Sequence, residues 1–286
     1  MKEQRPSFTA AWVAAARGFG DLLPAELHIA EDPYGAAFAS TSLPRRLAGS
    51  RLGRRLALTP GLGTWIMYMQ VRTRVLDDIA RTFAREHANA QVVLLGAGYD
   101  CRALRLGALA NVPVFEVDHP ATQGRKQRVL ARLGAESHAH YVTWDFESRP
   151  LAELPDALAA AGLDRKAPVL TIWEGVTMYL TQPAIDASLR AIHAFGPGRL
   201  AMTYFERTRI DSPSPMMRLV RASVRGIGEP FKWGWNRDDV PPYLAERGFR
   251  VRENRSLDEA AHDFLPSRAA ALVHGRNSCY ALAEVV

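Results

Sequence analysis

Residues 91–102, QVVLLGAGYDCR, are the stretch that most clearly indicates the fold. A short apolar run ends there at a Gly-Ala-Gly turn, and about one helix later a second apolar run, VPVFEVDHP at 112–120, ends at Asp118. Neighbouring parallel strands bring such ends to one edge of a sheet, where glycines let the backbone approach a ligand and an acid can bind ribose hydroxyls. The pattern therefore predicts an α/β fold that binds a nucleoside-containing cofactor.

The composition is that of a globular protein of 286 residues, 48% hydrophobic and 23% charged. With two cysteines, Cys101 and Cys279, no disulfide framework is indicated and a cytoplasmic location is expected. No apolar run approaches the roughly 18 residues of a membrane span. We expect neither a membrane nor a nucleic-acid partner.

The net charge of +6 is the one feature that favours a nucleic-acid partner. Most of the arginines are scattered along the chain, and the one cluster lacks the interleaved aromatic residues of a stacking platform. That cluster comprises Arg45, Arg46, Arg51, Arg54 and Arg55.

The first 90 residues are predicted to be an N-terminal helical cap. Ser7 can cap a helix that begins at Phe8, and residues 61–86 carry apolar side chains at helical spacing. Residues 91–286 are predicted to be the second domain, with a polar insert at about 206–235 that follows the fifth strand.

Strands and helices alternate from residue 91 onward. The predicted strands are 91–95, 112–117, 141–144, 168–173, 199–205, 249–255 and 278–285. The predicted helices are 102–109, 122–133, 151–161, 183–195 and 237–246. This order favours a doubly wound, Rossmann-like sheet of seven strands with an antiparallel seventh strand at the edge, which resembles class I methyltransferases more than dehydrogenases.

Asp100, beside the glycine turn of Gly96, Ala97 and Gly98, distinguishes between cofactors. A carboxylate there repels a diphosphate but tolerates the sulfonium-bearing amino acid of S-adenosyl-L-methionine. A plain helix N-cap is the alternative role for Asp100. Glu116 and Asp118 lie on one face of the second strand, and Asp118, at its end, better reaches a ligand.

Three further acidic or basic positions follow the same logic. Asp145 can accept the exocyclic amine of adenine while Phe146 stacks on the ring, or the two are a turn acid and a core aromatic. Glu174 can face an ammonium or sulfonium group, or pair with a nearby arginine. Arg72 or Arg74 can bind a carboxylate in a bidentate fork, or lie on a solvated helix face.

Four motifs in order resemble the leucine carboxyl methyltransferase family, which includes bacterial polyketide O-methyltransferases: VVLLGAGYDCRALRL, FEVDHPATQGRKQRVL, TWDFE and WEGVTMYL. The resemblance implies S-adenosyl-L-methionine as cofactor. We predict no metal site. The resemblance also implies that Gly96, Ala97 and Gly98 line the cofactor, that Asp118, with His119 beside it, holds the ribose, and that Asp145 and Phe146 hold the adenine. Arg72 and Glu174 would face the methionine end, with Arg17 nearby. Cys101 stands where the family usually has threonine, and a small buried side chain is expected there.

The substrate that would accept the methyl group is predicted to bind at the end of the fifth strand. Tyr204 and Arg207, at the end of the fifth strand, are predicted to face the substrate as catalytic residues. Apolar residues of the insert are predicted to form a lid, or else to pack on the sheet: Met216, Met217, Phe231, Trp233 and Trp235.

The leading hypothesis is O-methylation of a carboxyl or hydroxyl group of a small molecule, such as a polyketide-like secondary metabolite. Methylation of a protein C-terminal carboxylate, a nicotinamide-dependent oxidoreductase and a non-enzymatic binding module remain alternatives. The sequence does not indicate an oligomeric state.

Overall fold

A computed structural model describes residues 6–39, 50, 52–53, 55, 59, 61–226, 230–273 and 277–286. Of the basic cluster, Arg45, Arg46, Arg51 and Arg54 lie outside the described residues. No helix in the described part of the chain has the length and apolar character needed to span a membrane.

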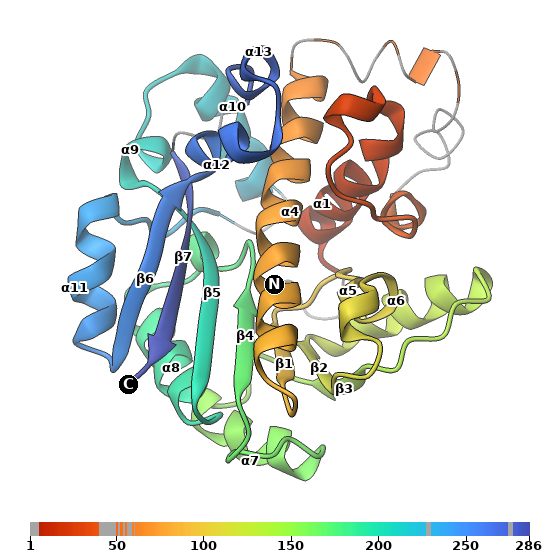
Figure 1. The fold of residues 1–286 in the computed structure, drawn as a ribbon. Coiled ribbons are helices and arrows are strands. Elements are labelled where there is room, and N and C mark those ends of the chain that lie inside the picture. Colours follow the sequence, from red (N-terminus) through yellow and green to blue (C-terminus); the bar gives the residue numbers. More distant parts are fainter. Residues whose placement is uncertain are drawn as a thin grey trace.

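The described residues form a seven-stranded sheet in the order β3-β2-β1-β4-β5-β7-β6 (Figure 1). Its strands are β1 (Gln91–Leu95), β2 (Val114–Asp118), β3 (His140–Thr143), β4 (Val169–Trp173), β5 (Gly198–Phe205), β6 (Phe249–Ser256) and β7 (Ser278–Val285). The neighbours from β3 to β5 are parallel, and β7 is antiparallel to both β5 and β6. The predicted doubly wound layout of seven strands is confirmed.

The prediction that the antiparallel seventh strand lies at the edge is wrong, because β7 is inserted between β5 and β6. The sequences of β6 and β7 explain why β6, and not β7, lies at the edge of the sheet. β7, SCYALAEV, is largely apolar and mostly buried, whereas half of the residues of β6, FRVRENRS, are charged and most are partly exposed. A strand at a sheet edge tolerates charge and is protected by it from pairing with other chains.

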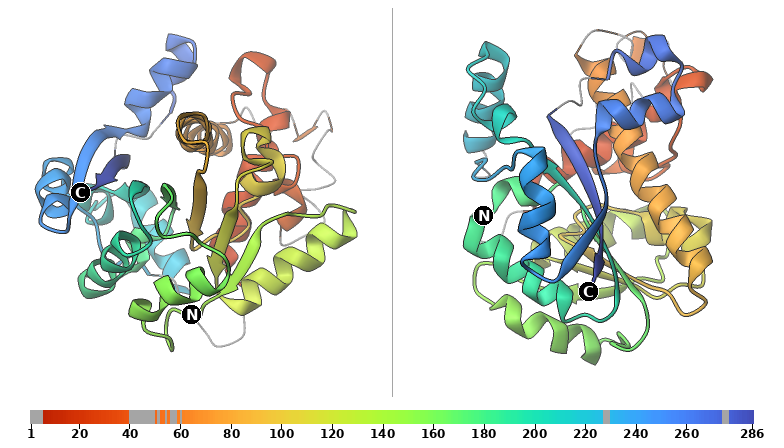
Figure 2. Two further views of the ribbon diagram at one scale, coloured as in Figure 1. Left: turned by 60° about the horizontal axis from the view of Figure 1, so that its bottom comes forward. Right: turned by 60° about the vertical axis from the view of Figure 1, so that its left-hand side comes forward.

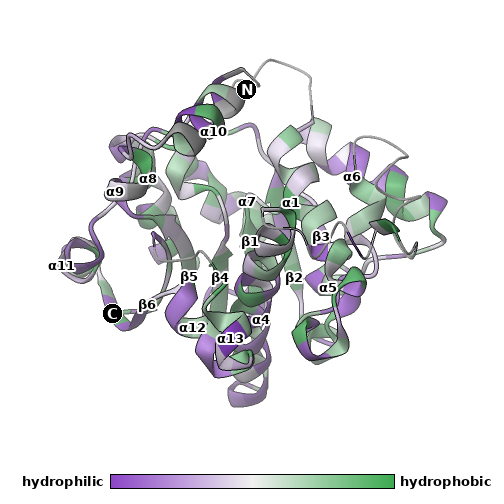
Figure 3. Ribbon diagram, turned by 90° about the horizontal axis from the view of Figure 1, so that it is seen from above, coloured by the Kyte–Doolittle hydropathy of each residue, from purple (hydrophilic) through white to green (hydrophobic). Residues whose placement is uncertain are grey.

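Helices cover both faces of the sheet (Figures 1 and 2). One face carries α4 (Leu62–Glu86), α5 (Arg102–Arg105), η4 (Gly107–Leu109) and α6 (Pro120–Arg132). The other carries α7 (Leu154–Ala160), α8 (Gln182–His193) and α11 (Val240–Ala245), with η5 (Leu151–Glu153) and η7 (Arg237–Asp239) before α7 and α11. The central strands are mostly hydrophobic, as Figure 3 shows, because they are buried on both sides.

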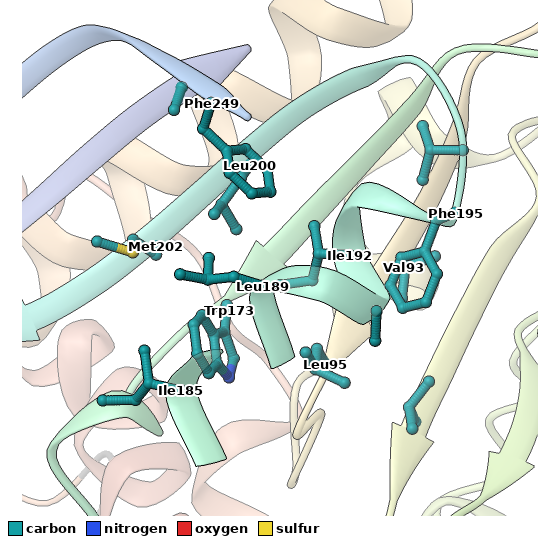
Figure 4. Close-up of a cluster of buried hydrophobic side chains, with 14 of the residues drawn as sticks. Val93, Leu95, Trp173, Ile185, Leu189, Ile192, Phe195, Leu200, Met202 and Phe249 are labelled. Atoms are coloured by element: carbon teal, nitrogen blue, oxygen red, sulfur yellow. The ribbon is translucent and has the colours of Figure 1, made fainter. Parts of the chain in front are cut away.

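The packing of α8 illustrates how the helices are held (Figure 4). Ile185, Leu189 and Ile192 recur at helical spacing and are buried against strand residues such as Trp173 and Met202. Each such side chain contributes roughly 1.5–3 kcal/mol by leaving water. This core fixes the carboxyl end of β4, where Glu174 follows.

The N-terminal region is helical, as predicted, and its described residues contain no strand. It comprises α1 (Phe8–Gly18), η1 (Phe19–Leu22), η2 (Ala25–Leu27) and η3 (Gly35–Phe38), followed by α4. Ser7 caps α1 as predicted, since its hydroxyl accepts a hydrogen bond from the amide of Ala10 at 3.1 Å. Because α4 shares one apolar cluster with the C-terminal part of the chain, residue 90 does not separate two independent cores.

Four α-helices in the described residues were not predicted: α9 (Arg207–Ile210), α10 (Pro215–Gly226), α12 (Leu257–Phe264) and α13 (Ser267–Ala270). For α12 a signal was present. Ser256 and Glu259 form a reciprocal capping box, the S-x-x-E pattern that precedes a helix.

Candidate functional site

A cavity of about 470 Å³ lies at the carboxyl edge of the sheet, the upper edge in Figure 1. Its wall comes from α1, α4, the ends of β1, β2, β4 and β5, and the turn η6 (Thr177–Tyr179). The strand order reverses between β1 and β4, and open α/β sheets bind ligands at such a switch point. The volume is within the range of small-molecule sites.

The glycine turn forms the floor beside β1. Gly96 has a φ of +72°, and a Cβ there would lie 2.7 Å from Cγ2 of Val176. Gly98 has a φ of +54°, and its Cβ would lie 3.2 Å from that of Ala10 in α1. Both glycines and Ala97 line the cavity, and their contact with a cofactor stays a prediction. Only glycine combines this backbone conformation with such close neighbours.

Asp118, at the end of β2, also lines the cavity. Its carboxylate accepts hydrogen bonds from the amides of Gly98 at 2.5 Å and His119 at 2.6 Å. Burial raises the pKa of Asp118, and these two amide donors oppose that rise. The remaining lone pairs of the carboxylate are free to accept ligand hydroxyls.

Glu116 and His119, the acidic and histidine neighbours of Asp118, make different contacts from it. Glu116 is buried beside the ammonium group of Lys126 and does not line the cavity. His119 does line it, but its Nδ1 accepts a hydrogen bond from the amide of Ala121 at 3.2 Å and so caps α6. Of the two acids of β2, Asp118 is therefore the one placed to meet a ligand.

Asp145 and Phe146 follow β3 and line the same end of the cavity. Asp145 accepts hydrogen bonds from the Ser148 hydroxyl at 2.8 Å and the Glu147 amide at 3.0 Å, and these bonds lower its pKa. The turn role of Asp145 is thus confirmed, while its binding of adenine stays a prediction. Phe146 is 39% exposed, so the alternative of a core phenylalanine is wrong.

Glu174 and Arg72 form an ion pair in the wall of the cavity, with Arg72 Nη2 and Glu174 Oε1 2.8 Å apart. Burial alone would raise the pKa of Glu174, but the guanidinium groups of Arg72 and Arg102 outweigh it and hold the pKa well below its usual range. The angles of the 2.8 Å contact are not those of a hydrogen bond. Among the residues that the structure describes, Arg72 Nε and Glu174 Oε1 are thus buried without a hydrogen-bond partner.

Other arginines near the cavity are paired. Arg74 lies on a solvated face and bonds Asp78 at 2.8 Å. Arg17 lines the cavity, where its Nε bonds Asp32 at 2.9 Å and its Nη2 bonds the carbonyl of Tyr99 at 2.8 Å. Arg102 was not singled out from the sequence. It is fully buried and contacts Asp77, Asp100 and Glu174.

Asp100 lines the cavity and also serves the local turn, because its carboxylate accepts the backbone amide of Arg102 at 2.7 Å. Cys101 is buried, and burial raises the pKa of its thiol to about 12, so it is no nucleophile near neutral pH. The described residues hold no group of three or more histidine, cysteine or acidic side chains that could bind a metal.

The structure does not support Tyr204 and Arg207 as substrate-facing residues. Side chains alternate along β5, so Tyr204 points with Met202 into the core, where its hydroxyl bonds Asn254 Oδ1 at 2.6 Å. Arg207 is exposed and lies over the ring of Trp233, 5.2 Å from its centroid. Neither residue lines the cavity, whereas Phe205, between them, does.

The insert divides into a part over the cavity and a part that packs. Pro230 and Lys232 line the cavity, and the amide of Lys232 bonds the carbonyl of Met178 at 2.8 Å. Phe231 stacks on Tyr179 and meets Phe205 edge-on, with ring centroids 5.7 and 5.5 Å apart.

Phe231 itself does not line the cavity, and neither do the other predicted lid residues whose side chains are described. Trp233 packs edge-on against Trp235, which is buried between Tyr204 and Tyr243, so packing is the role of both tryptophans. Met217 is buried, and the side chain of Met216 lies outside those described.

The strand order, the glycine turn and the acid at the end of β2 together define a class I methyltransferase fold. The family model of leucine carboxyl methyltransferase matches residues 10–193, and the chain belongs to this family.

Relatives agree with this assignment. One from Streptomyces coelicolor is 36% identical over 68% of this chain, and the match spans 64% of its own length, under two thirds. A second from the same organism is 37% identical over 77% of this chain and 75% of its own. Both are provisionally described as S-adenosyl-L-methionine-dependent methyltransferases.

Two solved structures share the fold at low sequence identity. A protein from Thermobifida fusca, provisionally described as a methyltransferase, has a TM-score of 0.59 and 16% identity, covering 99% of this chain and 96% of its own. A DUF574 family protein from Streptomyces avermitilis has a TM-score of 0.60 and 15% identity, covering 95% of this chain and 97% of its own.

Proposed function

We propose that this protein is an S-adenosyl-L-methionine-dependent O-methyltransferase that methylates a carboxyl or hydroxyl group of a small molecule. The observation that carries the proposal is a single cavity with two unlike ends. One end has hydrogen-bonding groups for a nucleoside and an amino acid, and the other is aromatic. Family membership and the descriptions of the relatives support the same cofactor.

The unpartnered atoms fit the amino-acid end of that cofactor. Glu174 Oε1 is a buried acceptor and Arg72 Nε a buried donor, each without a hydrogen-bond partner among the described residues, and their two side chains are in contact. An α-ammonium group would satisfy the first and an α-carboxylate the second. Buried polar atoms are rarely left unpaired in folded proteins.

The nucleoside end fits as well. Asp118 would accept the ribose hydroxyls, and Phe146 offers an exposed ring for adenine. The Asp100 carboxylate beside the glycine turn disfavours a dinucleotide, whose pyrophosphate would lie there. When bound, S-adenosyl-L-methionine supplies a methyl group on a positively charged sulfur. The protein's task is to align the acceptor oxygen and exclude water.

The other end of the cavity supports an aromatic or apolar acceptor. It is lined by Met178 and Tyr179 of η6 and by Phe205, and the rings of Tyr179 and Phe205 both contact Phe231. Trp65 and Tyr68 of α4 line the cavity beside Arg72. Lys232 lies at the same end as Met178, and no ion-pair partner for it is found in the described part of the chain. An acidic oxygen on a planar molecule, such as a polyketide acid or phenol, suits this combination.

The chemistry of the wall favours a carboxylate acceptor. Within the described residues His119 is the one histidine in the wall, and its Nδ1 is used in capping α6. A carboxylate is already ionised at pH 7 and needs no general base, whereas an alcohol benefits from one. The family's description, leucine carboxyl methyltransferase, points the same way and keeps a protein C-terminal carboxylate as the second candidate.

A labelling experiment tests the proposal. The protein is incubated with methyl-labelled S-adenosyl-L-methionine and three sets of acceptors: aromatic acids, phenols and peptides that end in leucine. Label that mild base releases is a methyl ester, and label that resists base is an ether. Ester formed on an aromatic acid is the expected result. Ester on peptides alone would replace the small molecule by a protein, and label on none of the acceptors would contradict the proposal.

A further inference from the structure

We propose that Arg102 is a positioning residue, which acts from outside the cavity to hold Glu174 in the orientation that binds the ammonium group of the cofactor. The proposal rests on the proposed function and adds to it a residue that does not touch the ligand. Arg102 is fully buried and is absent from the cavity wall.

The contacts of Arg102 join three parts of the fold. Its Nε bonds Asp77 Oδ1 of α4 at 2.7 Å. Its Nη1 bonds Glu174 Oε2, after β4, at 2.7 Å and also meets Asp100 in the glycine turn. A planar guanidinium with fixed donors fixes the carboxylates around it, which a flexible ammonium group does not.

The division of the Glu174 carboxylate carries the inference. Arg102 occupies Oε2, and Oε1 is the oxygen without a hydrogen-bond partner among the described residues. With one oxygen held from behind, the carboxylate cannot turn to give both oxygens to Arg72. Oε1 is in ion-pair contact with Arg72 Nη2 at 2.8 Å but has no hydrogen bond, so it keeps lone pairs for a ligand donor, while Arg72 Nε remains for a ligand acceptor.

The local charge balance explains why the cluster tolerates burial. Arg102 faces Asp77, Asp100 and Glu174, while Arg72 adds a second positive charge and Arg105 a third, since Arg105 also bonds Asp77. A zwitterionic amino-acid group adds no net charge to this set. Balanced charge lowers the cost of burying such a cluster, although Arg102 Nη2 and Arg105 Nε, like Arg72 Nε and Glu174 Oε1, are buried without a hydrogen-bond partner among the described residues.

The affinities for two ligands distinguish this positioning role from a purely structural one. S-adenosylhomocysteine carries the amino-acid group, and 5′-methylthioadenosine has the same nucleoside without it. In Arg102→Lys, which keeps the charge but loses the planar fork, we expect affinity for S-adenosylhomocysteine to fall about tenfold. Affinity for methylthioadenosine should change by less than about twofold, because that ligand makes no charge-assisted bond to Glu174.

Arg105→Lys is the matched control. Arg105 lies on the same short helix, is buried and bonds Asp77, but contacts neither Glu174 nor Asp100. The ratio of the two affinities should stay at the wild-type value in this variant. If Arg102→Lys fails to fold, Asp77→Asn, which releases the Nε of Arg102, should lower the ratio in the same direction.

Isothermal calorimetry of both ligands with each variant tests the positioning role of Arg102. A selective loss for S-adenosylhomocysteine in Arg102→Lys, absent in Arg105→Lys, supports the positioning role. Equal losses for both ligands, or an unchanged ratio in Arg102→Lys and in Asp77→Asn, would overturn it while leaving the proposed function intact. Failure of the wild-type protein to bind either ligand would instead overturn the proposed function.

Discussion

The two ends of the cavity are built in different ways. At the cofactor end Gly96 and Glu174 directly follow parallel strands and Asp118 ends one, so their positions are set by the sheet. At the acceptor end Tyr179 and Lys232 come from a 3₁₀ turn and the insert. The first end is mostly polar, with Asp118 bonded to backbone amides and Glu174 to Arg102, and the second is mostly aromatic.

This difference indicates that the two ends of the cavity have different roles. Polar groups held by backbone bonds lose little freedom when a ligand binds, so the cofactor end is preorganised for one ligand. Aromatic side chains on separate elements can vary with little effect on the sheet. The acceptor end is thus the part of the fold in which substrate preference can change.

Removing Glu174 should break the cofactor end most severely. Glu174→Gln leaves Arg72 and part of the charge of Arg102 uncompensated in a buried place, and we expect a loss of about 3 kcal/mol in the free energy of unfolding at pH 7. Thermal or urea unfolding of both proteins measures it.

The effect of Glu174→Gln should depend on pH. Because the folded-state pKa of Glu174 is lowered, its stabilisation is present above the unfolded value of about 4.3 and is lost as the pH falls below it. The difference in stability between wild type and variant should therefore shrink between pH 5 and the acid range. A difference that is constant with pH would show that the charge of Glu174 is not the cause.

Asp118→Ala should be the next largest effect. Charge-assisted hydrogen bonds are worth roughly 1.5–3 kcal/mol each, so affinity for S-adenosylhomocysteine should fall by at least about tenfold. Isothermal calorimetry gives the affinity, and circular dichroism checks that the fold persists. Affinity equal to that of wild type would mean that Asp118 does not bind the ribose.

A pair of phenylalanines compares the two ends with the same chemical change. Phe146→Ala removes an exposed ring at the cofactor end and should weaken S-adenosylhomocysteine by about 1–3 kcal/mol of stacking. Phe231→Ala removes the ring that pairs with Tyr179 and Phe205 and should lower turnover of an acceptor while leaving cofactor affinity within about twofold. Loss of cofactor affinity in Phe231→Ala would contradict the division into two ends.

The cofactor end could be predicted from the sequence because a strand end is a local signal. Gly96, Asp118 and Glu174 each stand after an apolar run, and a parallel sheet brings such positions together regardless of the chain between them. The position of α12 could have been found as well, since its capping box is written in Ser256 and Glu259.

The remaining features could not be predicted from the sequence, because they depend on how the strands and side chains pack in the folded protein. Its position near the end of β5 predicts that Tyr204 faces the substrate, but the alternation of the strand turns it into the core and turns Phe205 to the cavity. Arg102 has no local signal, because its importance arises from carboxylates 25 and 72 residues away in sequence. The place of β7 depends on pairing between distant strands, which periodicity does not encode.

The central claim, that this cavity holds S-adenosyl-L-methionine, is tested most directly by calorimetric titration with S-adenosylhomocysteine and, separately, with NAD. We predict saturable binding of one S-adenosylhomocysteine per chain and no measurable heat of binding for NAD at the same concentrations. Tight binding of NAD together with none of S-adenosylhomocysteine would contradict the account.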